Sequence, residues 1–277
     1  SVLPPQHVYA LFDALRKLQN GGVAILYISH KLEEIRELCD VATILRDGKV
    51  TGKVDPNKTS AQELATLMIG RSIPKIERRE SDNKSKNAIL NITNLNIKNP
   101  DPFGADLKDL SLSVFGGEIV GIAGVSGNGQ QELGRIISGE DIKGDLEPST
   151  IEMFDQSVTR KGVIERRDLG FSFVPEERLG RGAVPSMTLS QNSLLTAFKK
   201  GMLKNGFIQD DVVTEFTNKC INEFSVKASG NGATANSLSG GNLQKFLVGR
   251  ELVLEPKLLF LTSNIEVYNF IVHFFCI

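Results

Sequence analysis

A run of apolar residues that leads directly into a cluster of glycines constrains the fold of this chain most. Residues 118–123 (EIVGIA) have the composition of a buried strand, and residues 124–131 (GVSGNGQQ) follow with three glycines. A helical pattern then runs from Gln131 to Ser138. Strand, glycine turn and helix in this order predict an α/β unit whose backbone N–H groups can surround a phosphate. Glycine permits positive φ, and the start of a helix favours anions.

The glycine loop departs from a catalytic phosphate-binding loop at its last two positions. Glutamines stand where such a loop has a Lys for the outer phosphates and a Ser or Thr for magnesium. We expect a cradle that has lost most of its catalytic power. A dinucleotide-type or purely structural glycine turn is the alternative, because short glycine patterns are common. The candidate nucleotide-binding residues are Gly124, Val125, Ser126, Gly127, Asn128, Gly129, Gln130 and Gln131.

The overall composition is that of an ordinary globular protein. The chain has 277 residues, 40% of them hydrophobic, which is enough for one large or two modest domains. Its 32 basic and 33 acidic residues balance, so no overall positive field would attract nucleic acid or an anionic membrane. We therefore expect local binding sites and no nucleic-acid partner.

Cysteine usage and hydropathy predict where in the cell the chain resides. Cys39, Cys220 and Cys276 are odd in number and lack the spacing of metal ligands, which predicts free thiols in a reducing cytoplasm and no metal site. The longest apolar run, residues 268–277, contains Asn and His and is far shorter than a bilayer span requires. We expect a chain that does not itself cross a membrane.

The N-terminal residues predict several elements in close succession, as though the sequence began within a domain. These are a helix over residues 8–19, a buried strand over 23–28 (VAILYI), a helix over 31–39 capped by Ser29, and a hairpin of 41–45 and 49–53 that turns at Asp47-Gly48. Residues 71–87 are charged and nearly free of large apolar side chains, which is typical of a linker. Strands are then predicted over residues 88–92, 110–114 and 118–123.

A second glycine element lies about 110 residues after the first, in residues 236–245 (NSLSGGNLQK). Ser239, followed by two glycines, opens a helix predicted over residues 243–251. The serine hydroxyl and the backbone N–H groups that follow it form another anion site. A capped helix with a glycine turn and no ligand is the alternative.

This second element closely resembles the LSGGQ signature of ATP-binding-cassette (ABC) ATPases. The most specific phrases are GEIVGIAGVSGNGQQEL, FVPEERLGRGAVPSMTLSQN and LSGGNLQKFLVGREL, and they stand in the order the family has them. The chain is similar to part of the ATP-binding subunit of bacterial importers for simple sugars or nucleosides, the type that fuses two nucleotide-binding domains. The implied signature residues are Leu238, Ser239, Gly240, Gly241, Asn242 and Gln244.

The resemblance implies an α/β, P-loop NTPase-like fold with a parallel core sheet, an antiparallel β part and a helical part that carries the signature. Residues 1–70 would be the C-terminal part of the first nucleotide-binding domain, 71–87 the linker and 88–261 an incomplete second domain. Residues 262–277 depart from the family, with no acidic residue at the strand end, and we expect a frameshifted or miscalled tail. A short membrane-surface or partner segment is the alternative, although it lacks a basic face.

Three further residues take roles by resemblance. His30, in ILYISHKLEEI, resembles the switch histidine that contacts the terminal phosphate, with a structural His as the alternative. Glu176 stands at the place of the Q-loop Gln, which senses magnesium and the membrane partner, and a solvated acidic turn is the alternative. Phe103 is a candidate for stacking on adenine, although a core or loop Phe is the simpler interpretation.

The implied function is the ATPase subunit of an importer, held peripherally on the cytoplasmic face of the inner (plasma) membrane. Its partners would be transmembrane permease subunits and a periplasmic solute-binding protein. ATP and Mg2+ would bind between two paired cassettes, each P-loop facing the other domain's signature, and Gln130 and Gln131 would mark the degenerate site. We expect no ATPase activity from the chain alone. The alternatives are a non-catalytic nucleotide-binding scaffold that docks on a permease, and a soluble cassette ATPase of translation or repair.

Overall fold

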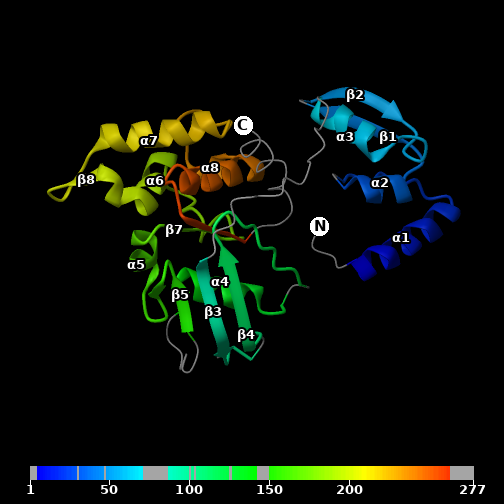
Figure 1. Cartoon of the computed structure of the whole chain (residues 1–277). Coiled ribbons are helices and arrows are strands. Elements are labelled where there is room, and N and C mark those ends of the chain that lie inside the picture. The colour runs from blue at the N-terminus through cyan, green and yellow to red at the C-terminus, as the bar shows by residue number, and fades with distance from the viewer. Residues whose placement is uncertain are drawn as a thin grey trace. The chain divides into compact units, whose positions relative to one another are not determined.

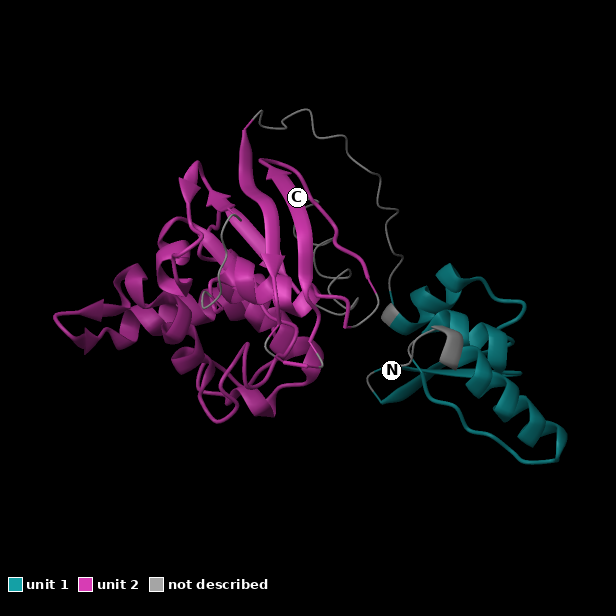
Figure 2. Ribbon diagram, turned by 90° about the horizontal axis from the view of Figure 1, so that it is seen from below, with its two compact units in different colours: residues 1–79 teal, residues 80–277 magenta. Residues whose placement is uncertain are grey.

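The computed structural model describes residues 5–29, 31–46, 48–70, 87–99, 101–102, 104–124, 127–141 and 150–262 (Figure 1). These residues form two compact units, one within residues 1–79 and one within residues 80–277 (Figure 2). Among the residues described, no helix combines the length and the apolar composition that crossing a bilayer requires.

The first unit is a small helical layer with one hairpin. It comprises α1 (Pro5–Asn20), α2 (Leu32–Leu38), β1 (Ala42–Arg46), β2 (Lys49–Val54) and α3 (Ala61–Ile69). The predicted helices and the antiparallel hairpin are confirmed. Its buried side chains include Phe12, Ile44 and Leu64. Ser60 and Glu63 form a reciprocal capping box at the start of α3, which satisfies backbone donors that a helix start leaves without partners.

The predicted strand over residues 23–28 is wrong. These residues are in no strand, and Leu26 and Ile28 are about nine-tenths exposed. A strand is stable when a neighbour accepts and donates its backbone hydrogen bonds, and the described part of this unit offers none there. Ser29 is also not the cap of the next helix: it accepts a hydrogen bond from the Lys31 N–H, and α2 starts one residue later.

The second unit combines an antiparallel sheet, a parallel strand pair and a group of helices. The antiparallel sheet has the order β4-β3-β5-β6, and the parallel pair consists of β7 and β10. Its elements are β3 (Ala88–Ile97), β4 (Leu107–Phe115), α4 (Gln130–Ser138), β5 (Thr150–Met153), β6 (Gln156–Ser157), α5 (Val163–Asp168), β7 (Phe171–Val174), α6 (Leu189–Ala197), η1 (Phe198–Met202), β8 (Leu203–Lys204), β9 (Phe207–Ile208), α7 (Asp210–Glu223), η2 (Ala235–Ser237), α8 (Gly240–Leu252) and β10 (Leu258–Leu261).

Two main cores hold this unit together. One lies between the antiparallel sheet and α4, where Leu133, Ile136 and Ile137 pack with residues of β3 and β5. The other lies among α7, α8 and β7, with Phe224 and Phe246 at its centre. The α/β class, the antiparallel part and the helical part that carries residues 238–244 are confirmed.

The predicted strand over residues 118–123 is wrong for the same reason as its counterpart in the first unit. Among the described residues it joins no ladder, and β10 pairs only with β7. Ile119 is 91% exposed. Apolar composition gives a segment the side chains of a buried strand, but the strand forms only where another strand supplies hydrogen bonds. The glycine loop therefore follows a segment that belongs to no strand among the described residues.

A buried arginine fixes the C-terminal end of α4. The Arg166 side chain is fully buried, and its guanidinium donates to the carbonyls of Ile137 (2.9 Å) and Val158 (2.7 Å), as well as to those of Ile136 and Lys161. The carbonyls at the end of a helix have no partner within the helix, so Arg166 caps α4. Burial lowers the pKa of Arg166 to about 10.

We predict that Arg166→Met destabilises the second unit by about 3 kcal/mol, because buried carbonyls then lose their donor. The chain has no Trp, so Cys220 is the better probe. This thiol is fully buried, and burial raises its pKa to about 12, so it stays unreactive while the unit is folded. Pulsed alkylation of Cys220 across a urea series therefore measures the loss. The control Arg135→Met changes an exposed side chain of α4 and should cost no more than about 0.5 kcal/mol; equal effects of the two variants would refute the capping role.

Candidate functional site

The first candidate site is the start of α4, where the glycine loop ends. Gly129 is the N-cap with φ of 100°, and Gly127 has φ of 90°. A Cβ at Gly129 would lie 2.7 Å from Cδ2 of Leu107 in β4, and the φ of 100° would strain any other residue there. The first N–H groups of α4 have no partner within the helix and carry its partial positive charge. The glycine at position 129 thus lets the backbone at the start of α4 pack closely against Leu107.

The two glutamines of the loop lie at the start of α4. α4 begins at Gln130, one residue before the predicted start, and the Gln130 side-chain amide lies against Gly124. Gln131 is exposed. Val125 and Ser126 lie outside the described residues. The loop offers backbone and amide donors, but positions 130 and 131 carry neither an ammonium group nor a hydroxyl.

A carboxylate in the first turn of α4 ties a second loop to the first candidate site. Glu132 Oε1 accepts from Asn99 Nδ2 at 3.0 Å and from the Ala105 N–H at 3.3 Å. Asn99 and Ala105 therefore lie beside the first turn of α4. Phe103, the candidate for stacking on adenine, belongs to this segment but lies outside the described residues. Sequence reasoning missed Glu132, although an acidic residue in the first turn of a helix is a common signal.

The second candidate site is the start of α8. Ser239 is the N-cap, and its Oγ accepts from Asn242 Nδ2 at 2.9 Å and from the Asn242 N–H at 3.5 Å. Asn242 Oδ1 in turn accepts from the Lys227 N–H at 2.9 Å. A Cβ on Gly241 would meet nothing within 4 Å, so the backbone faces open space. Leu238 packs against the second core and Gln244 is buried, which leaves the serine and glycines as the accessible part.

The loop after β7 places an arginine beside the start of α8. A Cβ at Gly240 would lie 2.6 Å from Nη1 of Arg178. Glu176, two residues earlier, is exposed, and Glu177 pairs with Arg181 at 3.3 Å. Arg181 also pairs with Glu140 at 2.6 Å, just beyond the end of α4. The loop that contains Glu176 thus contacts α8 and lies next to the end of α4, while the sensing role of Glu176 stays a prediction.

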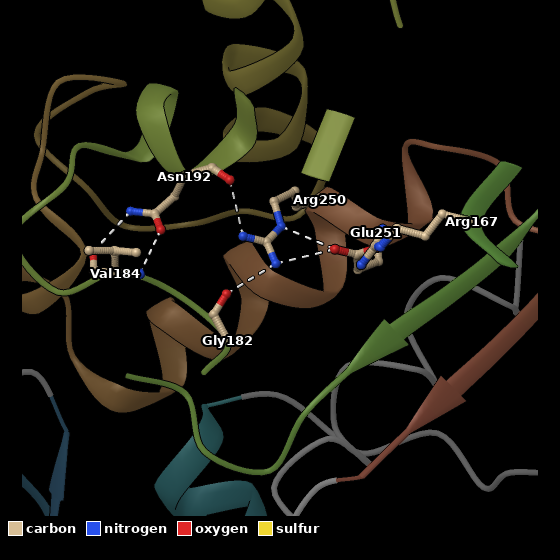
Figure 3. A network of polar contacts seen from close by, with 6 residues as sticks. All are labelled: Arg167, Gly182, Val184, Asn192, Arg250 and Glu251. Atoms are coloured by element: carbon tan, nitrogen blue, oxygen red, sulfur yellow. Dashed lines mark hydrogen bonds and ion pairs between the residues drawn. The ribbon is translucent and has the colours of Figure 1, made fainter. Parts of the chain in front are cut away.

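A buried charged network supports α8 from within (Figure 3). Arg250 donates to the carbonyls of Asn192 (3.2 Å) and Gly182 (3.1 Å) and pairs with Glu251 Oε1 at 3.2 Å. Arg167, which is only partly exposed, binds the other oxygen of Glu251 at 2.8 Å. Desolvation lowers the pKa of Arg250, and the Glu251 carboxylate opposes that shift. The network joins α8 to α5, to α6 and to the loop after β7.

Asn192 extends this network into the segment that joins β7 to α6. Its Oδ1 accepts from the Val184 N–H at 2.8 Å, and its Nδ2 donates to the carbonyls of Val184, Met187 and Thr188. The side chain is fully buried. No periodic pattern or motif pointed to this residue, because its partners are backbone groups of an irregular segment.

The predicted site residues fall into separate groups. Those of 238–244 lie together at the start of α8, and Gly127, Asn128, Gly129, Gln130 and Gln131 lie together at the start of α4. Glu176 lies on the loop whose Arg178 touches Gly240. His30 belongs to the first unit and lies outside the described residues, so its role stays a prediction.

We predict that Arg250→Met costs about 3–5 kcal/mol of unfolding free energy, because the buried Glu251 carboxylate would lose one of its two guanidinium partners and the carbonyls of Asn192 and Gly182 would lose their donor. Arg250→Met with Glu251→Leu should recover part of that loss, since an apolar pair leaves no charge behind in α8. Urea unfolding followed by Cys220 alkylation measures both. Lys245→Met, on the outer part of the same helix, is the control. Strict additivity of the single losses would show that the two side chains do not act as a pair.

Comparisons with known proteins identify the family of the chain. The model of a protein family described as ABC transporter matches residues 107–262. The chain is 35% identical to the nucleoside import ATP-binding protein NupA of Lactococcus lactis, over 95% of this chain and 51% of that protein. It is 32% identical to the galactose/methyl galactoside import ATP-binding protein MglA of Mannheimia succiniciproducens, over 96% and 52%. The chain thus spans about half the length of the curated relatives it matches.

Solved structures share the fold. The ATP-binding cassette MJ0796, solved as a dimer in a post-hydrolysis state with ADP and Pi, superposes with a TM-score of 0.54 at 18% identity, over 66% of this chain and 80% of that one. An ATP-binding subunit of an ABC transporter gives 0.50 at 18% identity, over 67% and 72%. At this identity the likeness concerns the fold alone.

Proposed function

The chain belongs to the ABC transporter family, and from that premise we propose that it is part of the ATP-binding subunit of a bacterial importer for simple sugars or nucleosides. In this proposal ATP binds between two paired cassettes and its hydrolysis energises transport. The relatives named above are import ATP-binding proteins for a nucleoside and for galactose, which supports the importer class. The residues at the starts of α8 and α4 support a role of this chain in binding nucleotide.

The observation that carries the proposal is the open start of α8. Ser239 is exposed at the N-cap, two glycines without side chains follow it, and the backbone at Gly241 faces open space. A serine hydroxyl and the N–H groups of a helix start suit phosphate oxygens. We propose that Leu238, Ser239, Gly240, Gly241, Asn242 and Gln244 act as the signature that closes on ATP held by another cassette's P-loop.

The start of α4 fits the phosphates of ATP in part. Gly127 and Gly129 have the positive φ that lets backbone N–H groups converge, and Gln130 adds a neutral amide donor. The same residues do not fit Mg2+ as a P-loop does, because Gln131 has no hydroxyl to hold the ion. We propose that residues 124–131 bind nucleotide without promoting hydrolysis. ATP bound elsewhere in the pair would supply the phosphoryl group that is hydrolysed.

We propose the following division of the chain: residues 1–70 as the C-terminal part of a first cassette, 71–87 as the linker, 88–261 as part of the second cassette and 262–277 as an aberrant tail. The relatives align along 95–96% of this chain, across both compact units, which supports a common origin for the two parts. In this arrangement His30 serves the site that pairs with Ser239, and the start of α4 faces a signature of the first cassette.

We also propose that the partners are transmembrane permease subunits and a periplasmic solute-binding protein. In this proposal Glu176 lies on the loop that contacts the permease. The subunit would be bound peripherally to the cytoplasmic face of the inner membrane. Permease and solute-binding protein genes beside this gene would support the importer class. Neighbouring genes for ribosomal or repair proteins would instead favour a soluble cassette ATPase. A non-catalytic scaffold on a permease is the second candidate, favoured by the glutamines at 130 and 131.

We predict that Gln130→Lys tightens the binding of a fluorescent ATP analogue to the purified chain by about tenfold, because a charged hydrogen bond to phosphate adds roughly 1.5 kcal/mol. Fluorescence titration at fixed ionic strength measures the dissociation constants. Gln62→Lys is the matched control, since it adds the same charge on an exposed position of α3. An equal effect of the two variants, or no binding by the original chain and by Gln130→Lys, would refute nucleotide binding at α4.

A second prediction separates the enzymatic proposal from the scaffold. The purified chain should release no phosphate from ATP, with or without magnesium, because residues 124–131 lack the Lys and the hydroxyl that hydrolysis requires. Magnesium-dependent turnover that His30→Ala abolishes would contradict this. Hydrolysis that appears with the complete transporter and falls with Ser239→Arg would support the ATPase role, and nucleotide binding without hydrolysis in that complex would favour the scaffold.

A further inference from the structure

A small hairpin projects from the helical part of the second unit between α6 and α7 (Figure 1). It consists of β8 and β9, joined by Asn205 and Gly206, whose φ angles are 52° and 81°. A two-residue turn with positive φ at both positions matches the twist of the two strands and makes a tight ribbon. Its base is anchored, since Met202 is fully buried and its carbonyl accepts from the Gln209 N–H at 2.8 Å.

The hairpin carries large apolar side chains that are largely exposed to solvent. Phe207 is 75% exposed, Ile208 51% and Leu203 43%. A loop that only connects two helices needs polar residues, and an isolated two-stranded ribbon is marginally stable in water. Three of the four strand residues are large and apolar. This composition indicates that an apolar environment covers the hairpin when the protein functions.

The register of the hairpin puts apolar surface on both of its faces. Leu203 is opposite Ile208, and Lys204 is opposite Phe207. Successive side chains of a strand point to opposite faces, so one face carries the Leu203–Ile208 pair and the other carries Phe207. A flat protein surface would cover one face of the ribbon only. A lipid interface surrounds both, which favours a membrane as the occupant.

The charge of the segment favours an anionic membrane surface. Residues 198–209 contain Lys199, Lys200 and Lys204 and no Asp or Glu. Lys199 is paired with Asp168, whereas Lys200 and Lys204 are exposed. The Lys204 stem can lie along the ribbon while its ammonium group reaches headgroup phosphates. Asp210 and Asp211 follow in the first turn of α7, where a carboxylate stabilises the helix start.

We propose that the β8–β9 hairpin is a membrane-surface anchor that inserts Leu203, Phe207 and Ile208 into the interface of an anionic lipid layer. Lys200 and Lys204 hold the headgroups. This site is separate from both anion-facing helix starts and does not depend on the nucleotide chemistry proposed above. It gives the chain a direct contact with lipid in addition to any contact made through a permease.

The test is co-sedimentation of the purified chain with vesicles of equimolar phosphatidylglycerol and phosphatidylcholine, compared with pure phosphatidylcholine. The original chain should bind the anionic vesicles, and the double variant Lys200→Gln with Lys204→Gln should bind about 30-fold more weakly at low salt, roughly fivefold for each lysine. Phe207→Ser with Ile208→Ser should weaken binding by about tenfold or more, because the apolar area inserted into the interface is lost.

The matched control changes another exposed apolar pair on a hairpin. Leu45→Ser with Val50→Ser alters residues that are 66% and 63% exposed on β1 and β2, and vesicle binding should not change. Circular dichroism and a sample spun without vesicles verify folding and solubility of each variant. The ATP-analogue titration should be unchanged in the hairpin variants, so failure of this proposal is distinct from failure of nucleotide binding.

Three results would overturn the anchor. The first is no binding of the original chain to anionic vesicles. The second is binding that the control pair reduces as much as the hairpin pair does. The third is unchanged vesicle binding together with loss of permease co-purification in Phe207→Ser with Ile208→Ser, which would make the hairpin a protein-docking surface.

Discussion

Buried guanidinium groups bound to backbone carbonyls hold the two helices on which the candidate sites depend. Arg166 binds the last carbonyls of α4, and Arg250 within α8 binds carbonyls of α6 and of the loop after β7. Removing such a charge from water is expensive, so these arginines persist only where carbonyl acceptors surround them. Each helix is fixed away from its start, so the residues that hold the helix are not those of its first turn. The anchors and the anion-facing ends are thus separate parts of the same helices.

Backbone hydrogen bonding also explains which sequence predictions hold and which do not. The hairpin of β1 and β2, the antiparallel strands β3 and β4 and the helices α4 and α8 were predictable, because local periodicity and turn residues determine them. Residues 23–28 and 118–123 have equally clear apolar runs but form no strand among the described residues. A strand is a property of a pair, and no single-sequence pattern shows whether the partner lies alongside.

The accessible residues of the candidate sites were predictable from the sequence, whereas the side chains that hold these residues in position were not. Ser239 as a cap and the glycine loop before α4 follow from motifs with fixed spacing. Glu132, Asn192 and Glu251 act through backbone groups or distant partners, up to 84 residues away for the pair of Arg167 with Glu251. Such contacts depend on how elements pack, and the residue types involved are common on exposed helices. Sequence reasoning therefore located the two helix starts that we propose as ligand-binding surfaces, and it missed the interior side chains that hold these helices in position.

The loop after β7 is where these supports converge. Its Arg181 pairs with Glu140 beyond the end of α4, its Arg178 lies over Gly240 at the start of α8, and its Gly182 carbonyl accepts from Arg250. A displacement of this loop therefore changes contacts at both helices together. Glu176 is exposed on the same loop, so a partner that pushes on it acts on a segment already joined to the supports of both helices. Coupling of this kind would require no contact between the partner and the ligand, because the charged pairs and the carbonyl bonds join the loop to both helices.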